Sequence, residues 1–209
     1  EKFRWFHSSD GFLVLGGRDA TTNEVLIKKQ MEPHDIVLHA DILGAPFVLI
    51  KTGEKTPPER TIRESAQLAA SYSRAWREML SAVDVYWVTP KQVDKSPPSG
   101  QYLRKGAFVI HGSKNFVRGV PLRVAIGVEM KEGQTVIVGG PVEAIGNQTN
   151  IYVELIPGEQ KSSELAKQIR RLLTKRVSEA SKKRILEIPL EEIQRFIPLG
   201  RGNIKVSGL

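Results

Sequence analysis

DIVLHADILGAPFVLIK, residues 35–51, contains two apolar runs on either side of Gly44 and Pro46. Runs of Val, Ile and Leu that are bounded by turn residues are typical of β-strands, so we predict strands from Asp35 to Ala40 and from Phe47 to Lys51. The same stretch is the longest candidate for a membrane span. Its polar and turn residues interrupt it well short of the roughly 20 apolar residues that a spanning helix needs. We therefore expect no membrane partner.

Turn chemistry and helix signals place the remaining elements around these two strands. Thr21-Thr22-Asn23-Glu24 has the pattern of a capping box, which starts a helix, and Pro57-Pro58-Glu59 starts another. A Pro/Ser/Gly-rich loop is expected at 94–100, and a loose tail at Gly200-Arg201-Gly202. The other expected elements are a hairpin of 3–6 and 12–15, a short helix from about Thr22, a long helix from 57 to about 82, strands at 83–88, 107–111, 122–130, 135–138 and 151–156, a second long helix from 162 or 163 to about 183, and a short helix at 189–196.

The order of these elements predicts the fold class. Strands and helices mix without a strict βαβ rhythm, which favours an α+β fold. We expect a mixed β-sheet packed by one long helix, followed by a second, smaller α+β unit with a basic amphipathic helix. A composition shift after Gly119 divides the chain into residues 1–119 and residues 120–209. The chain opens with Glu1, so we expect it to be a piece of a longer protein.

Charge and cysteine content narrow the function classes. The 209 residues include 31 Lys and Arg against 23 Asp and Glu, a net charge of +8, and no cysteine. The absence of cysteine excludes disulfides, thiol catalysis and thiolate zinc sites, and fits a reducing compartment. Residues 160–184 alone hold nine basic and two acidic residues. On a helix, Lys167, Arg171, Lys175 and Lys182 would line the side opposite the apolar stripe. Such a row suits a phosphate backbone or forms a merely solvated face.

Three short segments are candidate sites. Gly16-Gly17-Arg18-Asp19 lies between a strand and a helix start, where backbone amides and Arg18 suit an anion, or where the glycines form a tight turn. His39 and Asp41 lie on one face of a strand, near His34 and Asp35, which allows a metal site, contact with a base or ribose, or a hydrogen-bonded structural histidine. Residues 111–119 form an expected loop in which Lys114 and Arg118 suit phosphates, Asn115 suits a base edge, and Phe116 suits stacking or core packing.

Several blocks in the same order resemble the NFACT-R domain. The blocks are Gly17-Arg18-Asp19, Asn23-Glu24, Asp35, His39-Ala40-Asp41 with Gly44-Ala45, Val48-Leu49-Ile50-Lys51, Glu64-Ser65-Ala66, Ala70-Ser71-Tyr72-Ser73 and Gly112-Ser113-Lys114-Asn115. The resemblance spans about residues 3 to 118, and the remainder resembles the C-terminal extension of archaeal members. Leu43 stands where members often carry His, so a second imidazole beside His39 is not expected.

The resemblance implies an RNA-binding module of a cytoplasmic, ribosome-associated quality-control factor. Its expected partners are tRNA, rRNA, the large ribosomal subunit and the other domains of the same full-length protein. Members were formerly called fibronectin-binding proteins. The resemblance implies that the tRNA-engaging motif of the family lies in an N-terminal domain outside this chain. Untemplated C-terminal tailing of the nascent chain is therefore not assigned to the present chain. No catalytic residue, metal or cofactor is expected. The expected RNA contacts are Arg18, Asn23, His39, Lys51, Lys114, Asn115, Arg118, Lys167, Arg171 and Lys175.

Two other functions stay open at this point. One is a metal- or nucleotide-dependent enzyme centred on His39 and Asp41. The other is a protein-interaction scaffold whose positive charge only keeps it in solution. Strong salt dependence of RNA binding distinguishes the RNA-binding module from the enzyme and from the scaffold, because each phosphate contact releases a counterion.

Overall fold

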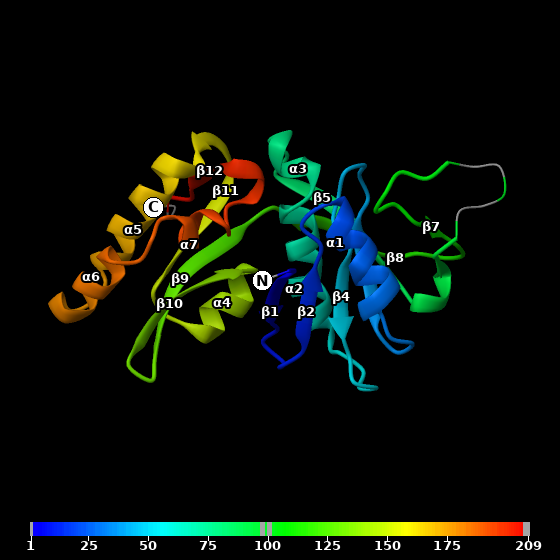
Figure 1. Cartoon of the computed structure of the whole chain (residues 1–209), viewed down its shortest axis with the longest axis horizontal. Coiled ribbons are helices and arrows are strands. Elements are labelled where there is room, and N and C mark those ends of the chain that lie inside the picture. The colour runs from blue at the N-terminus through cyan, green and yellow to red at the C-terminus, as the bar shows by residue number, and fades with distance from the viewer. Residues whose placement is uncertain (1, 97–98, 100–101, 207–209) are drawn as a thin grey trace.

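The computed structural model describes residues 2–96, 99 and 102–206, and these form two antiparallel sheets with helices (Figure 1). The first sheet has six strands in the order β1-β2-β4-β3-β5-β8, and the second has four in the order β10-β9-β11-β12. A two-stranded ribbon joins β6 and β7. The strands are β1 (Arg4–His7), β2 (Leu13–Gly16), β3 (Ile36–Ala40), β4 (Val48–Lys51), β5 (Ala82–Val88), β6 (Val93–Asp94), β7 (Val109–Ile110), β8 (Asn115–Pro121), β9 (Val124–Lys131), β10 (Gln134–Gly140), β11 (Tyr152–Lys161) and β12 (Arg201–Ile204).

The helices cover both sheets and confirm the α+β class. α2 packs on one face of the first sheet, and α1 with η1 packs on the opposite face. α4 and α5 pack on the second sheet. The helices are α1 (Ala20–Val25), the π-helix η1 (Leu26–Gln30), α2 (Glu59–Ser71), α3 (Arg74–Arg77), the 3-10 helix η2 (Pro90–Gln92), α4 (Val142–Gln148), α5 (Ser162–Thr174), α6 (Glu179–Leu186), α7 (Glu191–Gln194) and the 3-10 helix η3 (Pro198–Gly200).

The pairing of the predicted strands is antiparallel, whereas the sequence predicts a mixed sheet. The register Val37↔Leu49 joins the two strands of residues 35–51, as their apolar pattern predicts. Both strands are buried on both faces because helices cover each side. α4, which falls on no predicted element, adds a short helix between β10 and β11. The predicted loop at 94–100 lies partly outside the described residues.

Both predicted long helices are shorter than expected: the first is divided into α2 and α3, and the second into α5 and α6, with a serine as the N-cap of α3 and of α6. Ser73 donates to the carbonyl of Ala70 (2.6 Å) and accepts from the amide of Ala75 (3.2 Å), so it closes α2 and caps α3. Ser178 caps α6 by accepting from the amide of Ser181 at 3.4 Å. Serine side chains compete for backbone hydrogen bonds in this way, which interrupts a helix whose apolar period continues.

Two segments expected to be irregular are strands. Residues 115–121 form β8, with Gly119 at a φ of 63° beside the irregular register between Val83 and Val85. The tail at 200–202 is not loose, because Arg201 and Gly202 pair with β11 as part of β12. A Cβ on Gly202 would lie 3.2 Å from the indole of Trp76, so glycine permits this close approach.

The two sheets share one apolar core. Buried residues of the first sheet and α2, such as Val48 and Ala69, belong to the same cluster as Ile126 of β9 and Ile169 of α5. The passage from β8 to β9 falls at residues 122–123, within a few residues of the expected boundary after Gly119. The division of the chain into two domains stays a prediction.

Candidate nucleic-acid interface

A row of rings crosses the face of the first sheet that is opposite α2. His39 of β3 is in register with Tyr86 of β5, which is in register with Phe116 of β8. Residues that pair across strands point to the same face. The ring centroids of His39 and Tyr86 are 5.8 Å apart, and those of Tyr86 and Phe116 are 6.1 Å apart. Tyr86 is buried, while Phe116 at the outer strand is 38% exposed.

Two cations lie on the faces of these rings. Nζ of Lys114 is 4.5 Å from the centroid of the Tyr86 ring, and Cζ of Arg118 is 4.0 Å from that of Phe116. Both cations are exposed. Unpaired nucleobases stack on aromatic rings and guanidinium planes, and the adjacent phosphates pair with Lys and Arg. We call His39, Tyr86, Lys114, Phe116 and Arg118 the sheet surface.

Hydrogen bonds from neighbouring residues fix the sheet surface. Asp84 accepts from the amide of Gly119 (2.8 Å) and from Nη1 of Arg118 (2.9 Å). The Gly119 amide and then the Arg118 guanidinium lower the pKa of the Asp84 carboxyl. Asn115 donates to the carbonyl of Trp87 at 3.2 Å and stays exposed on β8. Arg118 is therefore oriented by an ion pair while its guanidinium covers the exposed ring.

His39 is held by backbone groups at the inner end of the row. Its Nδ1 lies 2.6 Å from the carbonyl oxygen of Ala40, and a carbonyl only accepts, so Nδ1 carries the hydrogen. Burial lowers the pKa of His39, the backbone of Ala40 and Ala45 opposes this, and Lys114 lowers the pKa further. The ring of Phe47 lies 4.7 Å from it on the side of α1. His39 is thus a neutral, packed ring at neutral pH.

The start of α1 is closed by its own side chains. α1 begins at Ala20, two residues before the predicted start near Thr22, and its N-cap is Asp19, whose carboxylate accepts from the amide of Thr22 at 2.8 Å. The carboxylate occupies the position that an anion would take. Gly17 donates to the carbonyl of Phe47 (3.0 Å), which fits the tight-turn alternative. Arg18 itself is exposed.

Two predicted contact residues are engaged inside the protein. Oδ1 of the buried Asn23 accepts from the amide of Phe47 at 3.1 Å. Nζ of Lys51 donates to Asp35 (2.5 Å) and to the carbonyl of Gln30 (2.6 Å), with its side chain 17% exposed. Both residues join segments that are distant in sequence, so their geometry is that of structural braces.

The predicted basic row follows α5, with Lys167 and Arg171 inside the helix and Lys175 at its C-cap. Leu165, Ile169 and Leu173 are buried against the second sheet, while Lys167, Arg171 and Lys175 are exposed. Lys182 belongs to a different helix, α6, because the helix ends before Ser178. Lys167 forms an exposed pair with Glu164 at 3.4 Å.

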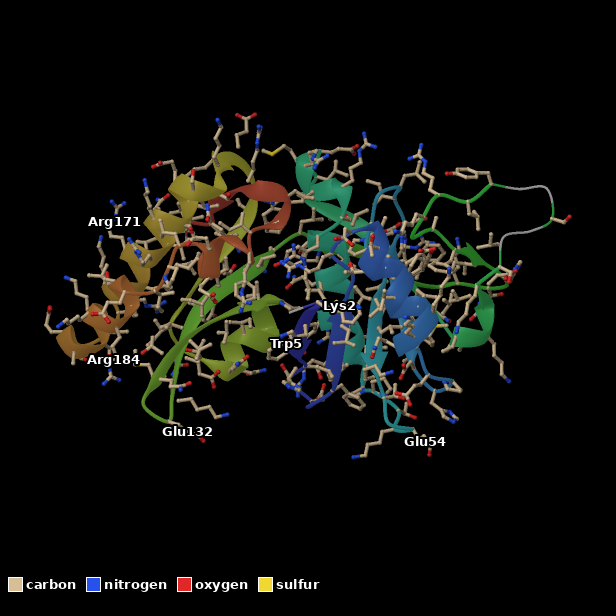
Figure 2. All side chains as sticks on the ribbon, in the orientation of Figure 1. Lys2, Trp5, Glu54, Glu132, Arg171 and Arg184 are labelled. Carbon is tan, nitrogen blue, oxygen red and sulfur yellow. The ribbon has the colours of Figure 1, made fainter. Side chains whose placement is uncertain are left out.

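The structure distributes the predicted contact residues over three places. Asn115 and Arg118 lie on β8, at one edge of the first sheet, Lys114 directly precedes this strand, and His39 lies two strands away. Arg18 lies close to Arg4 of β1, at the opposite edge of that sheet. Figure 2 shows Arg171 at one end of the long axis, and Figure 1 shows β8 toward the other. The cations therefore form separate patches.

The described residues contain no group of three or more His, Asp or Glu side chains arranged to hold a metal ion. No helix among them has the length and apolar character to cross a bilayer.

This arrangement defines a class of protein: an α+β domain whose antiparallel sheet presents rings and cations on one face, as single-stranded nucleic acid requires. A family model described as the NFACT protein RNA binding domain matches residues 2–112. The chain belongs to this family.

Curated relatives agree with this assignment. The chain is 41% identical over 172 residues to the archaeal Rqc2 homolog aRqcH of Methanocaldococcus jannaschii, which covers 82% of this chain and 26% of the relative. It is 47% identical over 121 residues to the ribosome quality control complex subunit NEMF of Homo sapiens, covering 56% of this chain and 11% of that protein. The chain thus spans about a quarter or less of these relatives.

One solved structure shares the fold. It is the C-terminal region of the fibronectin/fibrinogen-binding protein from Streptococcus suis, with a TM-score of 0.50 and 23% sequence identity. The alignment covers 58% of this chain and 46% of that chain. At this identity the likeness shows the fold.

Sequence reasoning missed Tyr86, the centre of the row. The run 83–88 predicts a strand, and its alternation places Asp84, Tyr86 and Val88 on one face. The register of Tyr86 with His39 and Phe116 shows that the row of rings lies on this face. The pairing register of strands that are distant in sequence cannot be predicted from the sequence of one segment.

Proposed function

We propose that this chain is the RNA-binding module of a ribosome quality-control factor and contacts tRNA or rRNA of the large ribosomal subunit through the sheet surface. One observation carries the proposal: an exposed Phe116 ring is covered by the guanidinium of Arg118, beside Lys114 over Tyr86. Aromatic faces take bases, and the two cations take the flanking phosphates. The family description and the names of the relatives support RNA and the ribosome as the setting.

In this proposal the module acts by binding and uses no cofactor. Its place of action is the cytoplasm, together with other domains of the full-length protein. Asn115 borders the sheet surface and takes a base edge. Asn23 and Lys51 act indirectly, because they position the strands beneath His39. The exposed row Lys167, Arg171 and Lys175 on α5 makes separate, sequence-independent phosphate contacts.

The test is RNA affinity of the Phe116→Ala chain, measured by fluorescence anisotropy with labelled tRNA and a large-subunit rRNA fragment. Loss of one stacking ring weakens binding by about 1–3 kcal/mol. Phe116→Leu keeps the apolar volume without the π face and is expected to lose nearly as much. Leu186→Ala removes another exposed apolar side chain, on α6, and serves as the control.

Unchanged RNA affinity of a folded Phe116→Ala chain contradicts the proposal. So does an affinity that is micromolar or weaker at low salt and barely changes when salt is added, because phosphate contacts make binding strongly salt dependent.

A further inference from the structure

An unpaired carboxylate lies beside the row of rings on the sheet surface. Asp41 directly follows β3, and its amide donates to the carbonyl of Asp84 at 2.8 Å, so the pairing of β3 with β5 continues to this residue. Side chains alternate along a strand, which places Asp41 on the same face as His39. Asp41 is exposed, and its carboxylate forms no hydrogen bond or ion pair within the part of the chain that the structure describes. It is therefore available to a ligand.

The neighbouring carboxylate on this face is already satisfied. Asp84, which lies opposite Asp41 on β5, accepts from the guanidinium of Arg118 and from the amide of Gly119. Like charges directly opposite each other on a sheet repel, and no cation among the described residues forms an ion pair with Asp41. A phosphate is repelled at this position, whereas a neutral group that donates hydrogen bonds is attracted.

The hydroxyl of Tyr86 is a second unsatisfied group beside Asp41. Tyr86 lies diagonally across from Asp41, because its partner in register is His39. Diagonal neighbours in a sheet are roughly 7–8 Å apart, within reach of an aromatic side chain. Tyr86 is 7% exposed, yet its hydroxyl forms no hydrogen bond with any described residue. Buried polar groups ordinarily have a hydrogen-bond partner, so this hydroxyl suits contact with a ligand.

The Tyr86 hydroxyl is a hydrogen-bond donor at neutral pH. Burial, and then the negative charge of Asp41, raise the pKa of Tyr86 to about 12. The hydroxyl therefore keeps its proton, whereas an ionised carboxylate only accepts hydrogen bonds. Together, Tyr86 and Asp41 offer one donor next to two acceptor oxygens.

The spacing of the strands favours contact with the edge of a base over contact with a ribose. Arg118, which suits a phosphate, lies on β8, and Asp41 follows β3, two strands away. Neighbouring strands are about 4.7–4.9 Å apart, so these two strands are separated by about 9–10 Å. A ribose hydroxyl lies only a few bonds from its own phosphate, whereas the edge of a base lies across the width of the nucleotide. A nucleotide whose phosphate contacts Arg118 therefore brings its base edge to Asp41 and Tyr86.

Guanine has the order of hydrogen-bonding groups that matches this pair. Its Watson–Crick edge presents the acceptor O6, followed by two donors, N1–H and the N2 amino group. Adenine and cytosine have an acceptor nitrogen beside their single amino group, and uracil has one N–H between two carbonyls. Each of these three bases would place a lone pair opposite one oxygen of the carboxylate. Proteins read unpaired RNA bases on this edge.

We propose that Asp41 and Tyr86 select guanine at the inner end of the sheet surface, with Asp41 accepting from N1–H and the N2 amino group and Tyr86 donating to O6. The inference rests on the proposed function, because the same RNA places its phosphates on Lys114 and Arg118. Stacking on rings and contacts with phosphates tolerate any sequence. The pair of Asp41 and Tyr86 adds selection of one base.

Fluorescence anisotropy with four labelled hexanucleotides tests the inference: UUUGUU, UUUAUU, UUUCUU and UUUUUU, which have the same length and charge. The guanine RNA is expected to bind roughly tenfold more tightly than the other three, as a bidentate contact with one base edge discriminates. In Asp41→Asn the ratio of the affinities for UUUGUU and UUUUUU is expected to fall to near one, because one acceptor oxygen becomes an amide donor. The ratio cancels the general effect of removing a negative charge.

Two further variants complete the test. Tyr86→Phe keeps the ring and removes only the hydroxyl, so it is expected to lower the ratio by a smaller, severalfold factor. Glu132→Gln removes an exposed carboxylate in the turn between β9 and β10 and is the matched control, which is expected to keep the ratio of the normal chain.

Three results overturn the inference. The first is equal affinity of the normal chain for all four RNAs, or a preference for another base. The second is a guanine preference that Asp41→Asn leaves unchanged in a folded chain. The third is an inosine RNA, UUUIUU, that binds as tightly as UUUGUU, since the N2 amino group then makes no contact.

Phe116→Ala separates this inference from the proposed function, because loss of the exposed ring is expected to weaken binding of all four RNAs by a similar factor. If Phe116→Ala weakens binding and the normal chain binds the four RNAs equally, the proposed function stands and the inference fails. If the normal chain binds none of the four RNAs at low salt, both fail.

Discussion

Gly17 has no room for a side chain, and this decides how the strands around His39 are held. A Cβ there would overlap Oδ1 of Asn23, the atom that accepts from the amide of Phe47. Phe47 in turn packs its ring 4.7 Å from His39. The sequence blocks contained Gly17, Asn23 and His39, and Phe47 was predicted only as the start of a strand. Their roles come from contacts across 24 positions of sequence, and a local pattern does not specify such contacts.

Gly17→Ala is therefore expected to lower the free energy of unfolding by about 1–3 kcal/mol, because the displaced Asn23 leaves the Phe47 amide without its acceptor. Urea denaturation measures the change. Gly16→Ala is the control, since a Cβ there would meet Leu68, Arg4 and Val48 at 3.4, 3.7 and 3.8 Å, which are ordinary contacts. Equal stability of the two variants would contradict this role of Asn23.

His39 predicts a pH dependence of stability. Its folded pKa lies below the ordinary value of 6.5, mainly through burial. The unfolded chain therefore takes up the proton first, so stability is fully present above about pH 6.5 and falls as the pH drops below it. Lys114 and Asp41 are the charges that act on it with opposite signs.

In His39→Phe, which keeps a ring and removes the titrating group, unfolding free energy is expected to change less between about pH 7.5 and pH 5.5 than in the normal chain. Chemical denaturation at both pH values provides the comparison. If the unfolding free energies of the two proteins change equally between these pH values, His39 keeps its ordinary pKa.

At the scale of elements, the periodicity of apolar residues and the turn residues predict most of the strands, but they do not predict the lengths of the helices. The apolar face continues through Ser73, but α2 ends at Ser71, and the hydroxyl of Ser73 donates to the carbonyl of Ala70 and accepts from the amide of Ala75. Gly119 and the polar residues of β8 obscure the alternation of apolar and polar residues, so its sequence predicts a loop. Pairing with β5 supplies the hydrogen bonds that its own sequence does not predict.

The basic row of α5, Lys167, Arg171 and Lys175, is expected to contribute to the salt dependence of RNA affinity. Replacing Lys167, Arg171 and Lys175 by Gln is expected to make the plot of log affinity against log salt shallower by about one for each phosphate that no longer meets a cation. Replacing Arg63, Arg74 and Arg77 of α2 and α3 by Gln removes the same charge elsewhere and controls for net charge. If both triple variants change the slope equally, the row acts only through total charge.

At the scale of the whole molecule, the sheets are joined through buried contacts. Trp76, which is 1% exposed, donates from Nε1 to the carbonyl of Arg201 at 2.7 Å. A Cβ on Gly140 of β10 would lie 3.5 Å from the Cβ of Phe6 of β1, so the two edge strands are in close contact. The composition shift after Gly119 indicated two units, whereas the single apolar core that includes residues of both depends on contacts between distant segments, which no local pattern specifies.

Trp76→Phe is expected to lower the free energy of unfolding by about 2–4 kcal/mol, because it removes a buried hydrogen bond and leaves a cavity. We also expect one transition, with circular dichroism and tryptophan fluorescence coinciding, since the two sheets share a core. Two separated transitions would instead favour independent domains at 1–119 and 120–209.

Three of the hydrogen bonds between the two sheets and their helices have the same direction. Arg4, Tyr72 and Trp76 donate from their side chains, and the acceptors are the backbone carbonyls of Arg195, Phe196 and Arg201. A carbonyl is present whichever amino acid occupies a position, so these bonds survive substitution on the accepting side and not on the donating side. During divergence we therefore expect the C-terminal segment to accept substitutions at residues such as Arg201, whereas Arg4, Tyr72 and Trp76 are retained. The hydrogen bonds then persist after the sequence of the accepting segment has changed.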